Sequence, residues 1–419
     1  MVSEMLNYLT MLFNKDIRKN FKYMHDLFKQ DENYSFRNLF NTIKHLSKNS
    51  KFCVLNDKII SGFVIPPFPS KPFLTYITAT KEKGNLYTQN ALLQKTAPLT
   101  VSLGVTDRCG YNCIYCSTKG RKSGKELSIS EWIKVIEVLQ DMGTAVITFT
   151  GGEPLLRDDL DEMIRTVDDR SMTLLFTSAQ GLTLERAREL KKAGLYGATI
   201  SIDSYDEAVQ NARRGSEKAF FNAVNGIENS LKAGLYTSAS CVASKDILER
   251  GDFFKILDFF ARLNVNEIIL IPPISSGNWL GKDEEMYTDQ DRNIFLRLQA
   301  KADKRYKKII ISSELNNCSM TRFGCAAGIN HSHINSYGEL FPCDFTPLSF
   351  GNVRNGDIKT LWNNMRNTID KPHCKCLADE VFPMIDGEEL PVSMKKSIEI
   401  CSKFKPDRYP DIYRKMLGE

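Results

Sequence analysis

The sequence predicts an α/β protein whose parallel strands curl into a full or partial barrel, and three observations support this fold class. Apolar runs of strand length alternate with helical patterns from about residue 98 to 310. The segment Lys-Ala-Gly-Leu-Tyr begins at Lys192 and again at Lys232, and each time a helix end, a glycine in the C-cap position and a strand follow one another. Right-handed crossovers between parallel strands favour a barrel.

The chain is expected to divide into three domains, 1–95, 96–310 and 311–419. The first is an α+β domain, because amphipathic helical patterns precede short strand-like runs within 52–65 and no catalytic motif is present. The last is rich in Cys, Gly and Pro and is expected to be irregular. The helical patterns of the first domain cover residues 5–17, 21–29 and 35–48.

The middle domain should contain six strands separated by helices. The best-defined helix is the first, where Ser128 and Glu131 can form a capping box and Gly143 can end the helix. Its apolar face consists of Trp132, Val135, Ile136, Leu139 and Met142. The six strands are expected near residues 99–105, 145–149, 173–177, 198–202, 237–243 and 267–272.

The composition is that of a globular protein without a strong preference for nucleic acid or membranes. Of the 419 residues 42% are hydrophobic and 26% are charged, and the formal net charge is only +5. No apolar run approaches the roughly 18 residues of a membrane helix, and the first residues do not resemble a signal peptide. We therefore expect a cytoplasmic protein. Eight of the eleven cysteines cluster at 109–116 and 318–376, which fits thiols that bind metal in a reducing compartment.

Three cysteines lie in the loop that follows the first expected strand. The spacing of Cys109, Cys113 and Cys116 lets three thiolates converge on one soft metal centre. A structural zinc site normally has four ligands, but the next cysteine is Cys241 and all five histidines are remote. A 4Fe-4S cluster held by three thiolates keeps one iron open for another ligand.

The loop after the second expected strand reads Gly151-Gly152-Glu153-Pro154. Two glycines let the backbone approach a ligand closely, and the carboxylate of Glu153 can bind an ammonium group. A tight turn with a solvated Glu153 is the alternative interpretation. Both loops follow strands, where the chemistry of such barrels lies.

The three-cysteine motif, with Tyr115 before its last cysteine and GGEP after the next strand, resembles the radical S-adenosylmethionine (radical SAM) enzymes over about residues 98–275. The resemblance implies a partial (β/α)6 TIM-like barrel in which the open iron binds S-adenosylmethionine (SAM). An electron from the cluster then cleaves SAM, and the 5'-deoxyadenosyl radical abstracts a hydrogen atom. The resemblance also implies that Gly151, Gly152 and Glu153 hold the methionyl amine and that Tyr115 packs near the adenine.

Further SAM contacts are implied by the segment ATISIDSYDEAVQNARRG, which resembles the family's fourth-strand region. Ser201 is the candidate for a ribose contact and Arg214 for the SAM carboxylate. Alternatively, Asp203 caps the next helix and Arg214 forms a surface ion pair. Where relatives often have Thr-Asn-Gly after the third strand, this chain has TSAQG (177–181), so the role of the asparagine is unfilled. In the loop IPPISSGNW after the sixth strand, Pro272, Pro273 and Ser275 are candidates to line the nucleoside end of SAM, but a plain loop is the favoured interpretation.

The cysteines of the last domain predict a second cluster. Their pattern resembles the twitch domain, a shortened SPASM domain with one auxiliary 4Fe-4S cluster, and the Cys-Lys-Cys end is similar to the sporulation-killing-factor thioether maturase type. Cys318 or Cys401 are the alternatives to one of the four expected ligands. The four expected ligands are Cys325, Cys343, Cys374 and Cys376.

These resemblances imply two 4Fe-4S clusters and SAM as cofactors, and a reducing donor such as flavodoxin or ferredoxin. The auxiliary cluster is expected to accept an electron from the substrate radical, so that the reaction is a dehydrogenation or a crosslink; binding of substrate by an open iron is the alternative. Three functions stay open. They are modification of a ribosomal peptide whose leader the first domain would grip, a small-molecule (carbohydrate or cofactor) dehydrogenase, and a non-catalytic structural metal protein. No catalytic side chain is identified.

Overall fold

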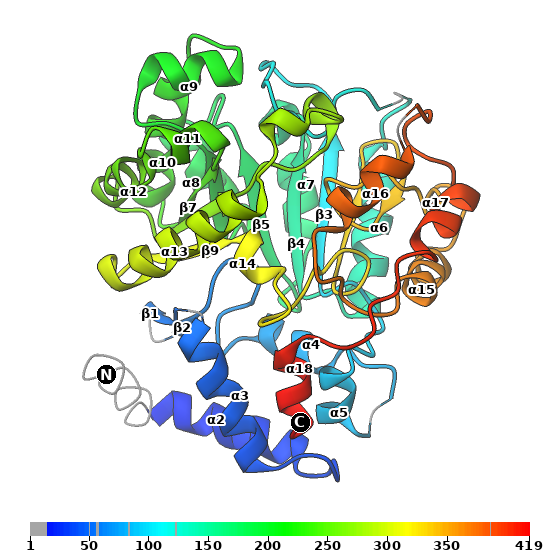
Figure 1. The fold of residues 1–419 in the computed structure, drawn as a ribbon. Helices are drawn as coiled ribbons and strands as arrows, with labels where there is room; N and C mark the ends of the chain where they lie inside the picture. The colour runs from blue at the N-terminus through cyan, green and yellow to red at the C-terminus, as the bar shows by residue number, and fades with distance from the viewer. Residues whose placement is uncertain (1–14, 50, 56–57, 83, 122–123, 386) are drawn as a thin grey trace.

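A nine-stranded sheet organises the computed structural model, which describes residues 15–49, 51–55, 58–82, 84–121, 124–385 and 387–419 (Figure 1). The strand order is β11-β10-β3-β4-β5-β6-β7-β8-β9, and every neighbouring pair is parallel except β10 and β11. Within the described residues the edge strands β9 and β11 do not pair with each other, so the sheet forms a partial barrel. The strands are β3 (Thr100–Thr106), β4 (Val146–Gly151), β5 (Met172–Thr177), β6 (Gly197–Ser201), β7 (Tyr236–Val242), β8 (Glu267–Ile271), β9 (Ile310–Ser313), β10 (His331–Ile334) and β11 (Leu340–Phe341).

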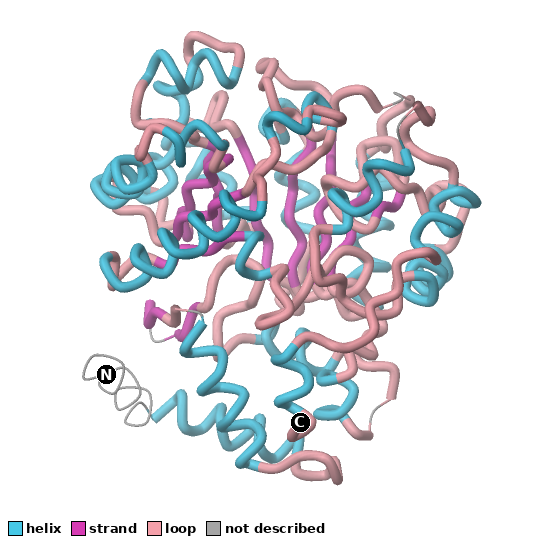
Figure 2. The backbone as a smooth tube through the Cα atoms, viewed as in Figure 1, coloured by secondary structure: helices cyan, strands magenta, loops and turns pink. Residues whose placement is uncertain are grey.

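Helices surround this sheet, which lies at the centre of the molecule in Figure 2. The helix after β3 has the expected ends, because Ser128 and Glu131 form the capping box and Gly143 adopts a left-handed conformation with φ of 108°. Its predicted apolar face is buried. The helices that connect the strands are α6 (Ile129–Met142), α7 (Leu160–Thr166), α8 (Leu184–Ala193), α9 (Glu207–Arg214), α10 (Ala219–Lys232), α11 (Lys245–Glu249), α12 (Phe253–Arg262) and α13 (Asp289–Arg305).

The six strands expected between residues 99 and 272 are confirmed as β3 to β8. The expectation that the last hundred residues are irregular is wrong for β10 and β11, which extend the same sheet beyond β3. These strands have four and two residues and no alternating pattern. Their pairing depends on β3, which lies far upstream in the sequence, and short apolar runs carry little local signal of such contacts.

The two faces of the barrel strands differ in chemistry. On the outer face, side chains such as Val101, Ile147 and Leu175 belong to the main apolar cluster that packs against the helices. On the inner face, small hydroxyl side chains stand in register, for example Ser102 beside Thr148. The other inner hydroxyl pairs are Thr199 beside Ser238 and Ser201 beside Ser240. The inner face therefore combines these hydroxyl groups with apolar side chains such as Leu174 and Ile269.

The N-terminal part forms a separate layer below the sheet (Figure 1). The expected helices at 21–29 and 35–48 correspond to parts of α2 and α3, whereas the expected helix at 5–17 lies mainly outside the described residues. A late helix, α18 (Asp411–Met416), returns to this layer, where the hydroxyl of Tyr87 donates to the Met416 carbonyl at 2.8 Å. The elements of this layer are α2 (Lys15–Phe28), α3 (Phe36–Asn49), β1 (Cys53–Leu55), β2 (Lys58–Ile60), α4 (Lys71–Thr78) and α5 (Leu86–Ala91).

Four further helices belong to the C-terminal part, and residues of all four contribute to the main apolar cluster of the barrel. They are α14 (Glu314–Asn317), α15 (Ile358–Thr368), α16 (Leu377–Ile385) and α17 (Met394–Cys401). None of the described helices is long and apolar enough to cross a membrane.

Lys95 joins the N-terminal layer to the barrel and is only 1% exposed. Its ammonium group donates to the Tyr76 carbonyl at 3.1 Å and to the side-chain oxygen of Asn90. Burial lowers the pKa of Lys95 to about 7, because the charged form is poorly solvated there.

We expect Lys95 to make stability depend on pH. The pKa of Lys95 is about 7 in the folded chain and about 10.4 in the unfolded chain. Between these pH values the unfolded chain binds a proton that the folded chain does not. The free energy of unfolding therefore rises with pH, by up to about 1.4 kcal/mol per pH unit. Thermal unfolding midpoints from about pH 7 to pH 9 should therefore rise more in the wild type than in Lys95→Met. Lys232→Met, on an exposed lysine of α10, is the control and should follow the wild type. Parallel pH profiles for wild type and Lys95→Met would contradict the assignment.

Candidate active site

The loop after β3 carries three cysteines, each with a hydrogen-bond donor beside its sulfur. The backbone N–H of Tyr111 donates to Cys109 Sγ at 3.5 Å, and Arg214 Nη1 lies 3.9 Å from Cys113 Sγ. The hydroxyl of Thr118 lies 3.3 Å from Cys116 Sγ. Burial raises the pKa of Cys109 and of Cys113, and the Tyr111 N–H and the Arg214 guanidinium oppose this by stabilising the thiolate, the form that binds metal.

The Gly-Gly-Glu turn after β4 holds the first residues of the cysteine loop. The N–H of Gly152 donates to the Thr106 carbonyl at 2.6 Å, and the N–H of Glu153 donates to the Arg108 carbonyl at 2.8 Å. A Cβ atom on Gly151 or Gly152 would lie closer than 3.0 Å to one of these two carbonyl oxygens. Both positions therefore require glycine for a steric reason that involves the chain itself.

Two other segments hold the rest of the loop. At the end of α9, the carbonyl of Arg214 accepts from the N–H of Asn112 at 3.1 Å. In the segment after β8, the N–H of Asn278 donates to the Cys116 carbonyl at 3.0 Å and its amide donates to the Cys113 carbonyl at 2.8 Å. Two glycines permit these approaches, since a Cβ on Gly215 or Gly277 would lie closer than 3.0 Å to the loop backbone.

Glu153 is fully buried, and its carboxylate is occupied by groups of the chain itself. It accepts from the Thr177 hydroxyl at 2.6 Å, from the N–H and hydroxyl of Ser178, and from the N–H of Leu155 at 3.2 Å. Burial raises the pKa of Glu153, while these bonds oppose the increase. The solvated turn considered above is thus wrong. The Gly152 carbonyl, in contrast, accepts no hydrogen bond from any described residue, so it is the free acceptor of this turn.

Asp203 connects the cysteine loop to three barrel elements. Its carboxylate accepts from Arg214 Nε at 2.7 Å, from the Val242 N–H at 2.8 Å and from the Tyr115 hydroxyl. The Arg214 guanidinium lies 5.2 Å from the centre of the Tyr115 ring. The alternatives considered above do not hold, because Asp206 caps α9 and the ion pair of Asp203 with Arg214 is buried.

Ser201 lies at the end of β6, on the inner face of the barrel. Its carbonyl accepts from the side-chain amide of Gln210 at 3.4 Å, and the side chain stands in register with Ser240. The structure thus gathers the expected cosubstrate residues around the cysteine loop from β4, β6 and α9. They are Tyr115, Gly151, Gly152, Glu153, Ser201 and Arg214.

Four cysteines of the C-terminal part interact with one another. The interaction of Cys318 with Cys325 raises the pKa of Cys318 and lowers that of Cys325 to about 7, while Cys318 Sγ lies 3.9 Å from Glu314 Oε2. The charge of Cys325 also acts on Cys343 and Cys376, whose pKa values are raised mainly by burial. Four thiols that repel as thiolates need a cation to offset their charge, and an iron-sulfur cluster supplies it.

Two other cysteines stand apart from this group. Cys374 is exposed. It is not among the groups whose charges act on Cys318, Cys325, Cys343 or Cys376. Cys401 is buried in the main apolar cluster, and burial alone raises the pKa of its thiol to about 12. The structure therefore brings Cys318, Cys325, Cys343 and Cys376 together.

The spacing of the cysteine side chains suits an iron-sulfur cluster better than a single metal ion. Among the described residues no three His, Cys, Asp or Glu side chains converge closely enough to hold one metal ion. A cluster distributes its thiolates over several irons and so spaces them more widely. Both thiol sets, one of three and one of four, suit iron-sulfur clusters in number and chemistry.

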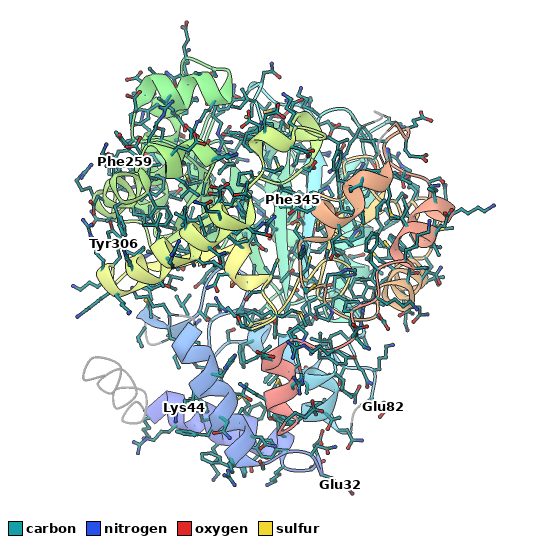
Figure 3. All side chains as sticks on the ribbon, viewed as in Figure 1. Glu32, Lys44, Glu82, Phe259, Tyr306 and Phe345 are labelled. Atoms are coloured by element: carbon teal, nitrogen blue, oxygen red, sulfur yellow. The ribbon has the colours of Figure 1, made fainter. Side chains whose placement is uncertain are left out.

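The two thiol sets lie on neighbouring segments. The Ser276 hydroxyl donates to the Phe345 carbonyl at 2.8 Å and lies 3.3 Å from the Ser117 carbonyl. Phe345 is labelled over the central part of the sheet in Figure 3. The loop predicted to be plain, IPPISSGNW, thus supplies Ser276, which contacts both segments, and Asn278, which contacts the first cysteine loop. Its position after a barrel strand was the only signal in the sequence for this role.

Comparison with known proteins agrees with this arrangement. Residues 103–246 match the model of the radical SAM superfamily, and residues 325–377 match an iron-sulfur cluster-binding domain, SPASM. The chain is 26% identical over 285 residues to the AdoMet-dependent heme synthase of Nitratidesulfovibrio vulgaris, covering 62% of this chain and 77% of that protein. It is 41% identical over 125 residues to the PqqA peptide cyclase of Bradyrhizobium diazoefficiens, covering 29% and 33%.

Solved structures show the same fold. The crystal structure of Streptococcus suis SuiB bound to its precursor peptide SuiA matches with a TM-score of 0.55 at 16% identity, covering 66% of this chain and 67% of that chain.

Gly152→Ala should damage the cysteine loop. The added methyl group would overlap the Arg108 carbonyl, and overpacking of this kind costs about 1 to 3 kcal/mol. We expect a lower thermal midpoint and less iron per chain after anaerobic reconstitution. Gly84→Ala is the matched control, since nothing lies within 4 Å of its Cβ position. Equal iron content in both variants would show that the turn tolerates a side chain.

Proposed function

We propose that this radical SAM enzyme, whose C-terminal part carries a second iron-sulfur domain, oxidises a residue of a ribosomally made peptide by crosslinking or dehydrogenation. The observation that carries the proposal is the contact of both cysteine segments with Ser276. When bound, SAM and the clusters supply a radical that removes one hydrogen atom from the substrate and an acceptor for the electron that leaves next. With release of a proton, the substrate loses two electrons overall.

The chain's own residues would bind and orient the reactants. The free carbonyl of Gly152 suits the methionyl ammonium, and the Glu153 carboxylate fixes the turn by its bonds to Thr177 and Ser178. Arg214 keeps its Nη2 for the SAM carboxylate, because its Nε binds Asp203 and its Nη1 lies beside Cys113 Sγ. The proposed roles of Ser201 at the ribose and Tyr115 near the adenine follow their places beside this loop. The proposed cluster ligands on this loop are Cys109, Cys113 and Cys116.

A peptide substrate is supported by the similar proteins. SuiB was crystallised with a precursor peptide, and the PqqA peptide cyclase is named for the peptide that it cyclises. We also propose the division into domains 1–95, 96–310 and 311–419, in which the first recognises the leader of the peptide. An electron donor such as flavodoxin or ferredoxin would reduce the clusters.

A small-molecule substrate is the second candidate. The similarity to AdoMet-dependent heme synthases favours it, because it covers 62% of this chain. The inner hydroxyl pairs of the barrel suit a polar small molecule as well as a peptide.

The first test is iron content and SAM cleavage under anaerobic conditions. The wild type should bind ~8 irons per chain and release 5'-deoxyadenosine with dithionite, whereas the variant with Cys109, Cys113 and Cys116 changed to Ala should keep ~4 irons and release none. Peptides encoded beside the gene are then co-expressed and examined by mass spectrometry. Loss of two hydrogen atoms supports the peptide, and heme formation without peptide modification supports the alternative. Zinc in place of iron would refute both.

We further propose Cys318, rather than Cys374, as a ligand of the auxiliary cluster, together with Cys325, Cys343 and Cys376. In the variant that lacks the three loop cysteines, only the auxiliary cluster contributes iron. There, Cys318→Ala should reduce iron and sulfide well below ~4 per chain, because one of the four expected thiolates is removed. Cys374→Ala is the matched control and should leave iron, sulfide and the visible spectrum unchanged. The opposite pattern would return the ligand to Cys374.

A further inference from the structure

Arg121 lies between the two cysteine segments. It follows the cysteine loop in sequence, and its Nη2 donates to the carbonyl of Asp344, the residue next to Cys343, at 2.8 Å. The guanidinium lies 5.4 Å from the centre of the Phe341 ring. Its Nη1 is buried and has no hydrogen-bond partner among the described residues. The side chain thus connects the end of the loop to the auxiliary segment.

No carboxylate in the described part of the chain forms an ion pair with Arg121. The anionic groups that act on it are Cys343, Asp344, Cys116 and Asp107. The Asp344 carboxylate faces His331 at 2.9 Å and His333 at 3.4 Å. Apart from Asp107, the remaining neighbours are therefore the sulfurs of Cys343 and Cys116, which would carry negative charge as thiolate ligands of a cluster.

The Asp107 carboxylate is also occupied. It accepts from the Ser336 hydroxyl at 3.2 Å and from the Tyr337 hydroxyl at 2.7 Å. A buried guanidinium without a counter-charge is strongly unfavourable. The position of Arg121 is understandable if clusters with net negative charge lie on both sides of it.

We propose that Arg121 places a fixed positive charge between the two clusters and thereby raises the reduction potential of each. The same charge would act on both the loop cluster and the auxiliary cluster, and in this sense it couples them. Reduction adds one negative charge to a cluster, and a fixed positive charge nearby stabilises the reduced form. The protein interior screens this interaction less than water does. The inference rests on the proposed function, since it requires that both clusters assemble.

The test is a redox titration of the reconstituted protein followed by electron paramagnetic resonance. Arg121→Gln removes the charge and keeps a planar amide, whereas Arg121→Lys keeps the charge. We expect Arg121→Gln to lower the midpoint potential of each cluster by at least about 59 mV. This shift corresponds to a tenfold change in the equilibrium constant for one-electron reduction. Arg121→Lys should keep most of the wild-type value. In the variant without Cys109, Cys113 and Cys116, Arg121→Gln should lower the auxiliary potential alone.

Arg366→Gln is the matched control. Arg366 lies on α15, donates to the carbonyls of Ile369 and Leu93, and has no carboxylate ion pair among the described residues, as is the case for Arg121. Its replacement should leave both potentials unchanged. Unchanged potentials in Arg121→Gln, with full iron content, would overturn the inference and leave the proposed function intact. Loss of iron in both Arg121→Gln and Arg121→Met would assign Arg121 to cluster assembly and also overturn it. A wild type that assembles no clusters would refute the proposed function itself.

Discussion

The arrangement of the site depends on one constraint, the close approach of three backbone segments to the cysteine loop. The turn after β4, the end of α9 and the segment after β8 each meet the loop through a glycine, namely Gly152, Gly215 and Gly277, at positions where a Cβ atom would overlap the loop backbone. These contacts fix the loop by main-chain hydrogen bonds rather than by side chains. The sulfurs are thereby held in place on a rigid scaffold, as a preorganised metal site requires.

The buried charges follow from this constraint. Because α9 must end against the loop, Arg214 enters the interior, and Asp203 at the end of the neighbouring strand supplies its counter-charge. The same pair orients Tyr115 by a hydrogen bond and a cation–π contact. Arg121, which follows the loop in sequence, has no such carboxylate ion pair among the described residues. Two arginines near one loop thus differ in what balances their charge, which is the physical basis for assigning them different roles.

The sequence was sufficient to predict features with a local signal. The six barrel strands, the capping box at Ser128 and the three-cysteine loop all follow from spacing, periodicity or turn chemistry within a few residues. It was not sufficient for contacts between distant segments. The partners of Glu153 come from the next strand, β10 pairs with a strand more than two hundred positions upstream, and Cys318 meets Cys325 only after the C-terminal part folds. Burial of Glu153 and Asp203 also has no signature in a single sequence, since acidic residues are usually exposed.

The return of α18 to the N-terminal layer has a consequence for the order of events during synthesis. The core of that layer includes Met416 beside Met24, Phe28 and Tyr87, so it stays incomplete until almost the whole chain has left the ribosome. Domains that need only early residues fold during translation, whereas this layer must wait. All the cysteines of both thiol sets are translated before α18. The layer proposed to recognise the peptide leader is therefore completed last, after every cluster ligand has been made.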